Sequence, residues 1–316
     1  GYDGQSRKWI KEDIGNYYAA GAYGISIYDN TYRLFFNTTS GQAEITKTDP
    51  PMENITFNNN LNLNNSNKDN GYILGEAFSS NRRIIGDIPA NKSSFSIKGD
   101  IPDPGTYLGK ELSSSLEKAG VKVNSSQSIR TNAQEDYNET IFYTHLSPPL
   151  KDIAKIINVR SNNHYAEHLI RAIGRSNTSS PSDALLNGIQ NIDSFWKNKG
   201  LDTEGLFMYD GCGLSPSNAV NASFMCDVLT QMKSNDNFLN SFPKAGLEGT
   251  VRNFLKGSKL EGKVRVKSGS IAKVQCFAGY YIDGNKKYAF TVMVNNFNGS
   301  HRDAVKAIEK LLLNIF

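Results

Sequence analysis

The most constraining feature of the sequence is a group of three apolar segments between residues 262 and 295, close to its C-terminal end. In the first segment, Val264 and Val266 alternate with basic residues, which is the two-residue period of a strand with one buried face. Residues 274–281 and 288–295 form two further apolar runs, and short polar turns separate the segments. The pattern predicts a three-stranded meander.

The first predicted strand carries Lys267, Ser268 and Gly269 near its end, followed by Ser270. A cation, a hydroxyl and a residue without Cβ at this place would line the edge of a cleft. A solvated lysine before a turn glycine gives the same tripeptide, and a single short motif is a weak indicator of function. The tripeptide therefore indicates a site only in combination with other motifs.

Length and composition favour a globular protein of about two domains. Hydrophobic residues make up 38% of the 316 residues and charged residues 21%, which is enough apolar material for a sizeable core. The net charge is +4 and the basic and acidic residues are interspersed, so we expect neither nucleic acid nor an anionic membrane as a partner. No apolar run approaches the roughly 18 residues of a spanning helix, so no membrane span is expected.

Cysteine and histidine usage argues against a metal or disulfide framework. Cys212, Cys226 and Cys276 are too few and too scattered for either, and we expect them to be small buried residues. His164 and His168 lie one helical turn apart and could chelate a metal, but their order, His-Tyr-Ala-Glu-His, differs from the His-Glu-x-x-His of zincins, and no third ligand is evident. We expect no metal and no cofactor.

The N-terminal part of the chain is predicted to be rich in strands. Residues 21–28 and 32–36 have the pattern of a β-hairpin around Asp29-Asn30. Residues 54–70 are very rich in asparagine, which is typical of an exposed loop. Three more strands are predicted at residues 71–78, 82–88 and 93–98.

Long helices alternate with strands in the rest of the chain. Ser161 stands at the start of a helix with an apolar stripe over residues 165–174, so its simplest role is that of an N-cap. The other helices are predicted over residues 107–120, 182–199, 222–233 and 302–315, with one more opening at 147–149.

Two short motifs in combination indicate a type of enzyme. Ser161-Asn162-Asn163 and Lys267-Ser268-Gly269 match S-x-N and K-[ST]-G, the motifs of serine enzymes that also use an upstream S-x-x-K. With its further similarities, the chain resembles the class C low-molecular-mass penicillin-binding proteins, a family of D-alanyl-D-alanine carboxypeptidases and endopeptidases. The similarities cover essentially the whole chain, at Trp9–Tyr18, Tyr143–Leu150, Ser161–Leu169, Asp210–Ser215, Gly246–Thr250 and Val264–Ser270.

The resemblance implies an α/β (α+β) fold: a β-lactamase/transpeptidase-like domain with an antiparallel sheet flanked by helices, plus a β-rich inserted domain. Residues 1–20 would be the remnant of the N-terminal part of the transpeptidase-like domain and a linker. Residues 21–140 would be the β-rich inserted region. Residues 141–316 would be the transpeptidase-like domain that carries S-x-N and K-S-G.

The resemblance also implies roles for the catalytic groups. Ser161 and Asn163 would relay a proton to the leaving amine and hydrogen-bond the substrate amide. Lys267 would supply positive potential for the proton relay and for the terminal carboxylate of the substrate. A lysine can act as a base when burial and other cations lower its pKa.

Substrate binding would fall to the residues around Gly269. Ser268 and Ser270 stand where the family usually has hydroxyl residues that bind the terminal carboxylate. The strand after Gly269 would align the substrate backbone by β-augmentation.

The sequence departs from the family at the nucleophile. In the family, S-x-x-K lies upstream of a segment like the one that starts here at Trp9, so we expect the nucleophile to be absent from this chain and the chain to be inactive alone. The segments that fit S-x-x-K include Ser115–Lys118, Ser194–Lys197 and Ser270–Lys273. The first two lie inside amphipathic helices and the third belongs to the K-S-G strand end, so none is expected to be the nucleophile.

The resemblance implies a penicillin-binding, serine-type D-Ala-D-Ala carboxypeptidase or endopeptidase that acts on peptidoglycan stem peptides in the periplasm or cell envelope. Its partners would be stem peptides and β-lactams, and exposed sheet edges could pair two copies of the chain. The alternative is a non-catalytic pseudoenzyme of the same fold that binds stem peptides. A purely structural β-protein would explain the asparagine-rich tract but not the ordered motifs.

Overall fold

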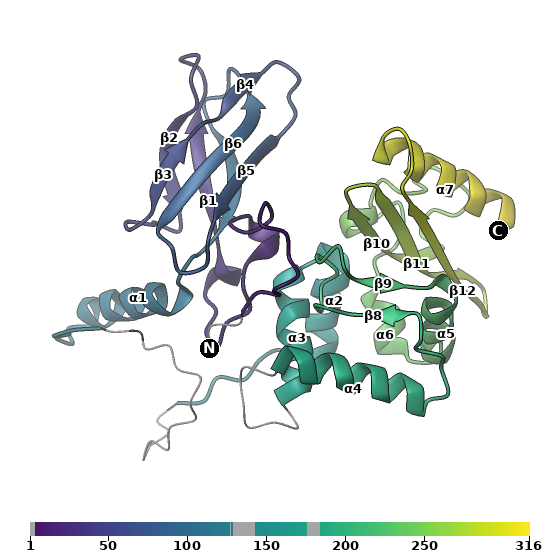
Figure 1. Cartoon of the computed structure of the whole chain (residues 1–316). Helices are drawn as coiled ribbons and strands as arrows, with labels where there is room; N and C mark the ends of the chain where they lie inside the picture. Colours follow the sequence, from purple (N-terminus) through teal and green to yellow (C-terminus); the bar gives the residue numbers. More distant parts are fainter. Residues whose placement is uncertain (1–3, 127, 129–142, 176–183) are drawn as a thin grey trace. The chain divides into compact units, whose positions relative to one another are not determined.

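The computed structural model describes residues 4–126, 128, 143–175 and 184–316, and the chain divides into two compact units (Figure 1). The first unit comprises Gly1–Glu135 and Glu167–Leu185, and the second comprises Asp136–Ala166 and Leu186–Phe316. Each unit has its own apolar core.

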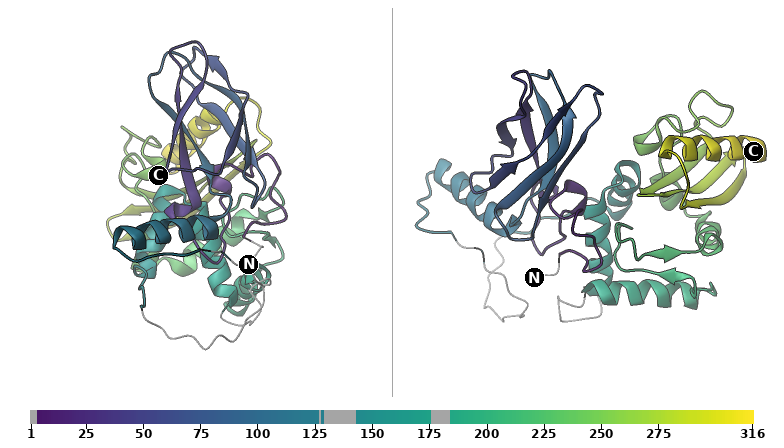
Figure 2. Two further views of the ribbon diagram at one scale, coloured as in Figure 1. Left: turned by 90° about the vertical axis from the view of Figure 1, so that its left-hand side faces the viewer. Right: turned by 45° about the horizontal axis from the view of Figure 1, so that its top comes forward.

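The first unit contains two β-sheets whose strands are stacked face to face in Figures 1 and 2. In one sheet β1 is central and antiparallel to β2 and β7. In the other, β6 pairs in parallel with β3 and β4 and antiparallel with β5. The strands are β1 (Thr31–Asn37), β2 (Glu44–Asp49), β3 (Thr56–Asn59), β4 (Asn62–Asn64), β5 (Asn70–Gly75), β6 (Asn81–Pro89) and β7 (Phe95–Asp100).

Alternating apolar residues from both sheets form the core of the first unit. Leu34 of β1, Ile73 of β5 and Ile84 of β6 are fully buried in one cluster. Beside it, Arg82 Nη2 donates to Asp100 Oδ1 at 2.8 Å, and both side chains are almost inaccessible to solvent. Burial raises the pKa of Asp100, while the Arg82 guanidinium opposes this shift.

Two predictions for this region are wrong. Residues 21–28 form no strand, because Tyr28, Asp29 and Asn30 all adopt positive φ and β1 begins only at Thr31. The asparagine-rich tract is not simply an exposed loop, since it contains β3 and β4. Its apolar side chains at positions 55, 57, 61 and 63 pack against the core, which explains why these strands form despite the poor strand propensity of asparagine.

The second unit is built on the predicted meander, which the structure confirms. Strands β10 (Val264–Ile271), β11 (Val274–Asp283) and β12 (Lys286–Asn295) form an antiparallel sheet in that order. The register pairs Val266 with Gly279 and Lys267 with Ala278. Side chains of directly paired residues share a face, so neighbouring positions of β10 face opposite sides of the sheet.

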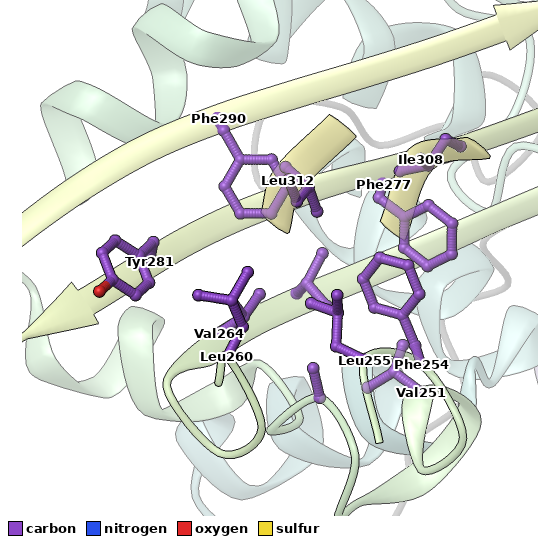
Figure 3. Packing of buried hydrophobic residues seen from close by; sticks show 12 residues of the cluster. Val251, Phe254, Leu255, Leu260, Val264, Phe277, Tyr281, Phe290, Ile308 and Leu312 are labelled. Atoms are coloured by element: carbon purple, nitrogen blue, oxygen red, sulfur yellow. The ribbon is translucent and has the colours of Figure 1, made fainter. Parts of the chain in front are cut away.

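Each face of this sheet is covered by helices, as Figure 1 shows. On one face, Val264 and Val266 pack with Phe277 of β11 and with Ile308 and Leu312 of α7 (His301–Ile315). Figure 3 shows this cluster from close by, including the ring of Phe254 that stacks on Phe277 at 4.0 Å and 7°.

The other face of the sheet carries a smaller cluster. Tyr280 of β11 packs with Leu229, Leu239 and Phe242, and its hydroxyl donates to Leu229 O at 2.6 Å. These partners come from α5 (Ala222–Met232) and from α6 (Asp236–Ser241) with the residue that follows it. Because Lys267 pairs with Ala278, its side chain belongs to this second face.

The remaining elements are α1 (Pro104–Lys118), α2 (Leu150–Arg160), α3 (Asn163–Arg175), α4 (Ala184–Asn198), β8 (Leu206–Phe207), β9 (Ala219–Val220) and the 3₁₀ turns Tyr17–Ala19, Tyr28–Asn30 and Gly249–Val251. The predicted α/β (α+β) class, with an antiparallel sheet flanked by helices and a separate β-rich region, is confirmed. The finer division into residues 1–20, 21–140 and 141–316 stays a prediction. No described helix is long and apolar enough to cross a membrane.

Candidate active site

The S-x-N and K-S-G motifs meet in the second unit. Lys267 Nζ, from β10, donates to Ser161 Oγ at 2.9 Å and to Ser268 O at 2.5 Å. The contact joins residues 106 positions apart in the chain. It places a cation and a hydroxyl from two separate elements at hydrogen-bond distance.

Local backbone geometry explains how Ser161 comes to lie there. Ser161 ends α2 in the left-handed conformation, with φ 53° and ψ 50°, and its N–H donates to Ile157 O. The predicted N-cap role of Ser161 is wrong, because Asn162 caps α3 by accepting from Tyr165 N at 2.9 Å. Freed from capping, the Ser161 hydroxyl is available to Lys267.

Asn163 is the first residue of α3 and is half-buried. It lies two positions after Ser161, on the other side of the capping residue. The sharp change of direction at residues 161–163 therefore places both polar side chains of S-x-N at one helix junction.

Burial changes the acid–base chemistry of Lys267. Desolvation lowers the pKa of its ammonium group from the ordinary 10.5 to about 8. The side chain therefore gains and loses a proton close to neutral pH, which is what a proton-transfer group requires. The Lys267 ammonium donates to one hydroxyl and one carbonyl oxygen and is itself the positive charge of the site. Such a cation attracts an anionic ligand and repels a metal ion.

Ser268 is held from the opposite side of β10. Its Oγ lies 3.2 Å from Thr250 Oγ1. Thr250 belongs to the turn Gly249–Val251, and Gly249 has φ +52°. A Cβ on Gly249 would lie 2.1 Å from Val159 O of α2, so glycine allows this turn to approach the helix that ends at Ser161.

Ser270 is in contact with the start of α7. Its Oγ lies 3.2 Å from His301 Nδ1, which is also 3.2 Å from Gln275 Oε1. Gln275 is buried in β11, and its amide nitrogen donates to Gly269 O at 3.1 Å. Both hydroxyls of the Ser268-Gly269-Ser270 segment thus have partners within the second unit.

β10 pairs with β11 along its whole length, but in the described part of the chain only its first part has backbone partners on its other edge. Val266 N donates to Pro243 O at 3.0 Å, and Val264 O accepts from Ala245 N at 2.8 Å, so these residues direct their backbone groups away from β11. By the alternation of a strand, Ser268 and Ser270 do the same. Within the described residues, no further segment continues the pairing beyond Val266.

The three S-x-x-K segments named above lie in different surroundings, and a fourth segment also fits the pattern. In this fourth segment, Ser241–Lys244, the serine is buried and its Oγ donates to Phe238 O at 2.6 Å. Ser115–Lys118 lies in α1 of the first unit and continues to the end of that helix. Ser194–Lys197 lies in α4, where Lys197 Nζ is 3.8 Å from Asp193. In Ser270–Lys273, Ser270 contacts His301 and Lys273 Nζ donates to Gly299 O at 3.1 Å.

Sequence reasoning did not identify Thr250, Gln275 or His301 as part of this site. The available signal was strongest for Gln275, a polar residue inside an otherwise apolar strand that is 4% exposed. Thr250 lies in a segment that resembles the family, but the resemblance gave it no role. Of the histidine pair considered for metal binding, His164 is buried and His168 Nε2 lies 2.9 Å from Ser26 Oγ. All three cysteines are half-buried rather than fully buried.

Comparison with known proteins identifies similar chains. The model of the D-Ala-D-Ala carboxypeptidase 3 (S13) family matches residues 2–314. A D-alanyl-D-alanine carboxypeptidase of Actinomadura sp. (strain R39) is 28% identical over 253 residues, which are 73% of this chain and 46% of the relative. The D-alanyl-D-alanine carboxypeptidase DacB of Haemophilus influenzae is 24% identical over 299 residues, which are 92% of this chain and 62% of the relative.

The fold is similar to that of solved structures. The crystal structure of penicillin binding protein 4 (dacB) from Haemophilus influenzae has a TM-score of 0.81 at 20% identity, covering 100% of this chain and 72% of the other. The same protein complexed with a novel β-lactam has a TM-score of 0.74 at 20% identity, covering 93% of this chain and 70% of the other. The transpeptidase-like fold predicted from the sequence is thereby confirmed. The chain spans about half to two thirds of the length of the curated relatives it matches.

Proposed function

The chain belongs to the D-Ala-D-Ala carboxypeptidase 3 (S13) family, and from this premise we propose that it binds peptidoglycan stem peptides and β-lactams at Ser161, Asn163 and Lys267. These residues are the S-x-N and K-S-G parts of a serine-type D-Ala-D-Ala carboxypeptidase or endopeptidase site. The observation that carries the proposal is the 2.9 Å contact between Lys267 Nζ and Ser161 Oγ, which joins the two motifs.

The chemistry of such a substrate matches the polar groups of the site. A stem peptide that ends in D-Ala-D-Ala has a terminal carboxylate, and Lys267 offers a cation to it. Ser268 and Ser270 carry hydroxyl groups on the other face of the same strand and would reach the carboxylate around the strand edge. When a serine attacks the penultimate carbonyl, the leaving amine needs a proton, and Ser161, which accepts a hydrogen bond from Lys267, would relay one.

The backbone at the edge of β10 would bind the main chain of the peptide. Ser268 and Ser270 direct backbone groups away from β11, on the side where Pro243 and Ala245 pair with the earlier part of the strand. An extended peptide would continue this pairing as an added strand. Backbone hydrogen bonds would fix its direction, and Asn163 would bond its amide.

We further propose that none of the four S-x-x-K segments supplies the nucleophile, so that these 316 residues by themselves bind ligands without forming an acyl-enzyme. Ser241 of the fourth segment is buried and its hydroxyl donates to Phe238 O. The support is that Ser115 and Ser194 lie within α1 and α4, and that Ser270 is engaged with His301. A fluorescent penicillin should leave no covalent label on the denatured chain. A label mapped to any serine would overturn this part of the proposal.

Binding itself is tested with an N-acylated D-Ala-D-Ala dipeptide and, as a matched control, its L-Ala-L-Ala counterpart. Calorimetry should detect the first ligand and not the second, and Lys267→Ala should abolish the difference. Absence of binding by the wild-type chain would contradict the proposed function.

A non-catalytic pseudoenzyme that holds stem peptides is the second candidate, supported by the same surroundings of the S-x-x-K segments. It predicts binding without turnover under every condition, whereas the first candidate predicts turnover when a serine nucleophile is available. Either function places the protein in the periplasm or cell envelope, where peptide cross-links lie. Pairing of two copies through sheet edges finds no support among the described residues, and light scattering on the purified chain tests it.

A further inference from the structure

His301 makes contacts that the proposed site does not yet explain. It is the first residue of α7, and its ring meets three polar atoms of the β10–β11 hairpin. Nδ1 lies 3.2 Å from both Ser270 Oγ and Gln275 Oε1, and Nε2 lies 2.5 Å from Ala272 O. The ring of Phe297 packs edge-on against it at 5.1 Å and 81°.

The hydrogen-bonding capacity of these atoms restricts where protons can lie. Ala272 O can only accept, so Nε2 carries a proton. The amide nitrogen of Gln275 donates to Gly269 O at 3.1 Å, which turns its oxygen toward Nδ1.

Two arrangements of Ser270 follow from the two protonation states of the ring. If Nδ1 has no proton, the only donor available to it is the Ser270 hydroxyl, which then points away from a ligand. If Nδ1 is protonated, Ser270 Oγ and Gln275 Oε1 both accept from it. The Ser270 hydroxyl then keeps its own proton for a ligand.

We propose that His301 is a positioning residue that sets the direction of the Ser270 hydrogen bond, and that binding of a carboxylate ligand is coupled to uptake of a proton by His301. The inference rests on the proposed function, because it takes Ser270 as a residue that faces the terminal carboxylate of the ligand. It goes beyond that function by assigning a role to a residue outside both motifs.

The charged groups near His301 are mostly cations, which favours an anionic ligand. Lys273 lies on the hairpin, with its Nζ bonded to Gly299 O, and α7 contributes Arg302, Lys306 and Asp303, the last of which caps the helix with Ser300. From β11 the facing group is the neutral Gln275. A bound carboxylate would add a negative charge to this set of groups.

Because ligand and proton favour the same state, each increases the affinity of the protein for the other. Calorimetry in two buffers of different ionisation enthalpy measures the proton uptake directly. At about pH 7, in the range where histidines change charge, the wild-type chain should take up a proton when it binds N-acetyl-D-Ala-D-Ala. It should take up none with the C-terminal carboxamide of the same dipeptide.

Two variants separate this role from a purely structural one. His301→Asn keeps a polar group near the Nδ1 position but does not titrate, so it should lose the proton uptake and bind the carboxylate ligand about tenfold more weakly. Ser270→Ala should lose the same uptake, and the double variant should be no worse than the weaker single variant. His145→Asn, at an exposed position, is the matched control and should behave as wild type.

The outcomes distinguish the two claims. If the wild-type chain binds the carboxylate ligand and His301→Asn retains the full proton uptake, the role of His301 is wrong while the proposed function stands. Equal uptake with the carboxamide would also overturn the role of His301. If the wild-type chain binds neither ligand, the proposed function fails and this inference fails with it.

Discussion

Lys267 Nζ lies 2.9 Å from Ser161 Oγ, and this contact connects the edge strand of a sheet with the left-handed residue that ends a helix. Neither residue is unusual within its own element. Their meeting combines a lysine of lowered pKa with a hydroxyl that no longer serves as a helix cap.

Replacing Lys267 with methionine should stabilise the fold. At pH 7 the folded protein holds a largely desolvated ammonium group, which costs stability, and methionine fills similar space without a charge. We expect the free energy of unfolding to rise by about 1–2 kcal/mol after the lost hydrogen bond to Ser161 is subtracted. Lys263→Met, at an exposed position just before the strand, should change it little.

The same group predicts a pH dependence with a definite sign. Between a folded pKa of about 8 and the ordinary 10.5, the unfolded chain binds more protons at this lysine than the folded chain does. The contribution of Lys267 to the free energy of unfolding therefore rises with pH across this window and is constant below it. Urea titrations from pH 7 to 10 should show the rise as a difference between wild type and Lys267→Met, and parallel curves would contradict it.

Glycine at position 161 should separate backbone strain from chemistry. The φ of 53° is costly for serine and free for glycine, so Ser161→Gly should stabilise the chain by about 0.5–1 kcal/mol, whereas Ser161→Ala should not. Both variants remove Oγ, so both should weaken binding of an acyl-D-Ala-D-Ala dipeptide by about fivefold. Different affinities for the two variants would show that backbone geometry, not the hydroxyl, controls the site.

Two glycines near the site should respond differently to alanine. At Gly269 an added Cβ would approach nothing closer than Cys276 Cβ at 3.7 Å, an ordinary contact. Gly269→Ala should therefore fold normally and bind ligand about tenfold more weakly, because the methyl group stands on the face of Lys267. Gly249→Ala, with φ +52° and Val159 O at 2.1 Å, should lose about 1–3 kcal/mol of stability in thermal denaturation.

The core beneath β10 should be sensitive to the loss of one ring. Phe254 is 4% exposed and stacks on Phe277, so Phe254→Ala should cost about 3–5 kcal/mol in the free energy of unfolding. Phe207→Ala, at a ring position that is 54% exposed, serves as the control and should cost about 0.5 kcal/mol or less. A similar loss in both variants would mean that the cluster is not the stabilising core of this unit.

The sequence predicted the parts of the fold whose signal is periodic. The alternation at Val264 and Val266 predicted β10, and the apolar stripes predicted the helices. The hairpin at residues 21–36 was wrong because three successive positive φ values are not visible in a pattern of apolar residues. The strands of the asparagine-rich tract were missed because residues 55, 57, 61 and 63 alternate correctly but stand among poor strand formers.

The site was predictable only as far as its motifs reach. Resemblance brought Ser161, Asn163 and Lys267 together, and the distance between Lys267 and Ser161 is consistent with that grouping. The N-cap reading of Ser161 failed because the chain uses Asn162 for the cap, and a serine in the left-handed region leaves no mark on the sequence. Thr250 and His301 reach the site through tertiary packing, which no local pattern records.

The pleat of β10 directs alternate side chains to the two faces of the sheet. Val264 and Val266 face the α7 cluster, whereas Lys267 and Gly269 face the other side of the sheet. Substitutions of Val264 or Val266 should change the stability of the protein, whereas under the proposed function substitutions of Lys267 or Gly269 should change which ligands it binds. Related proteins can therefore differ in ligand preference through substitutions that leave the stability of the fold unchanged.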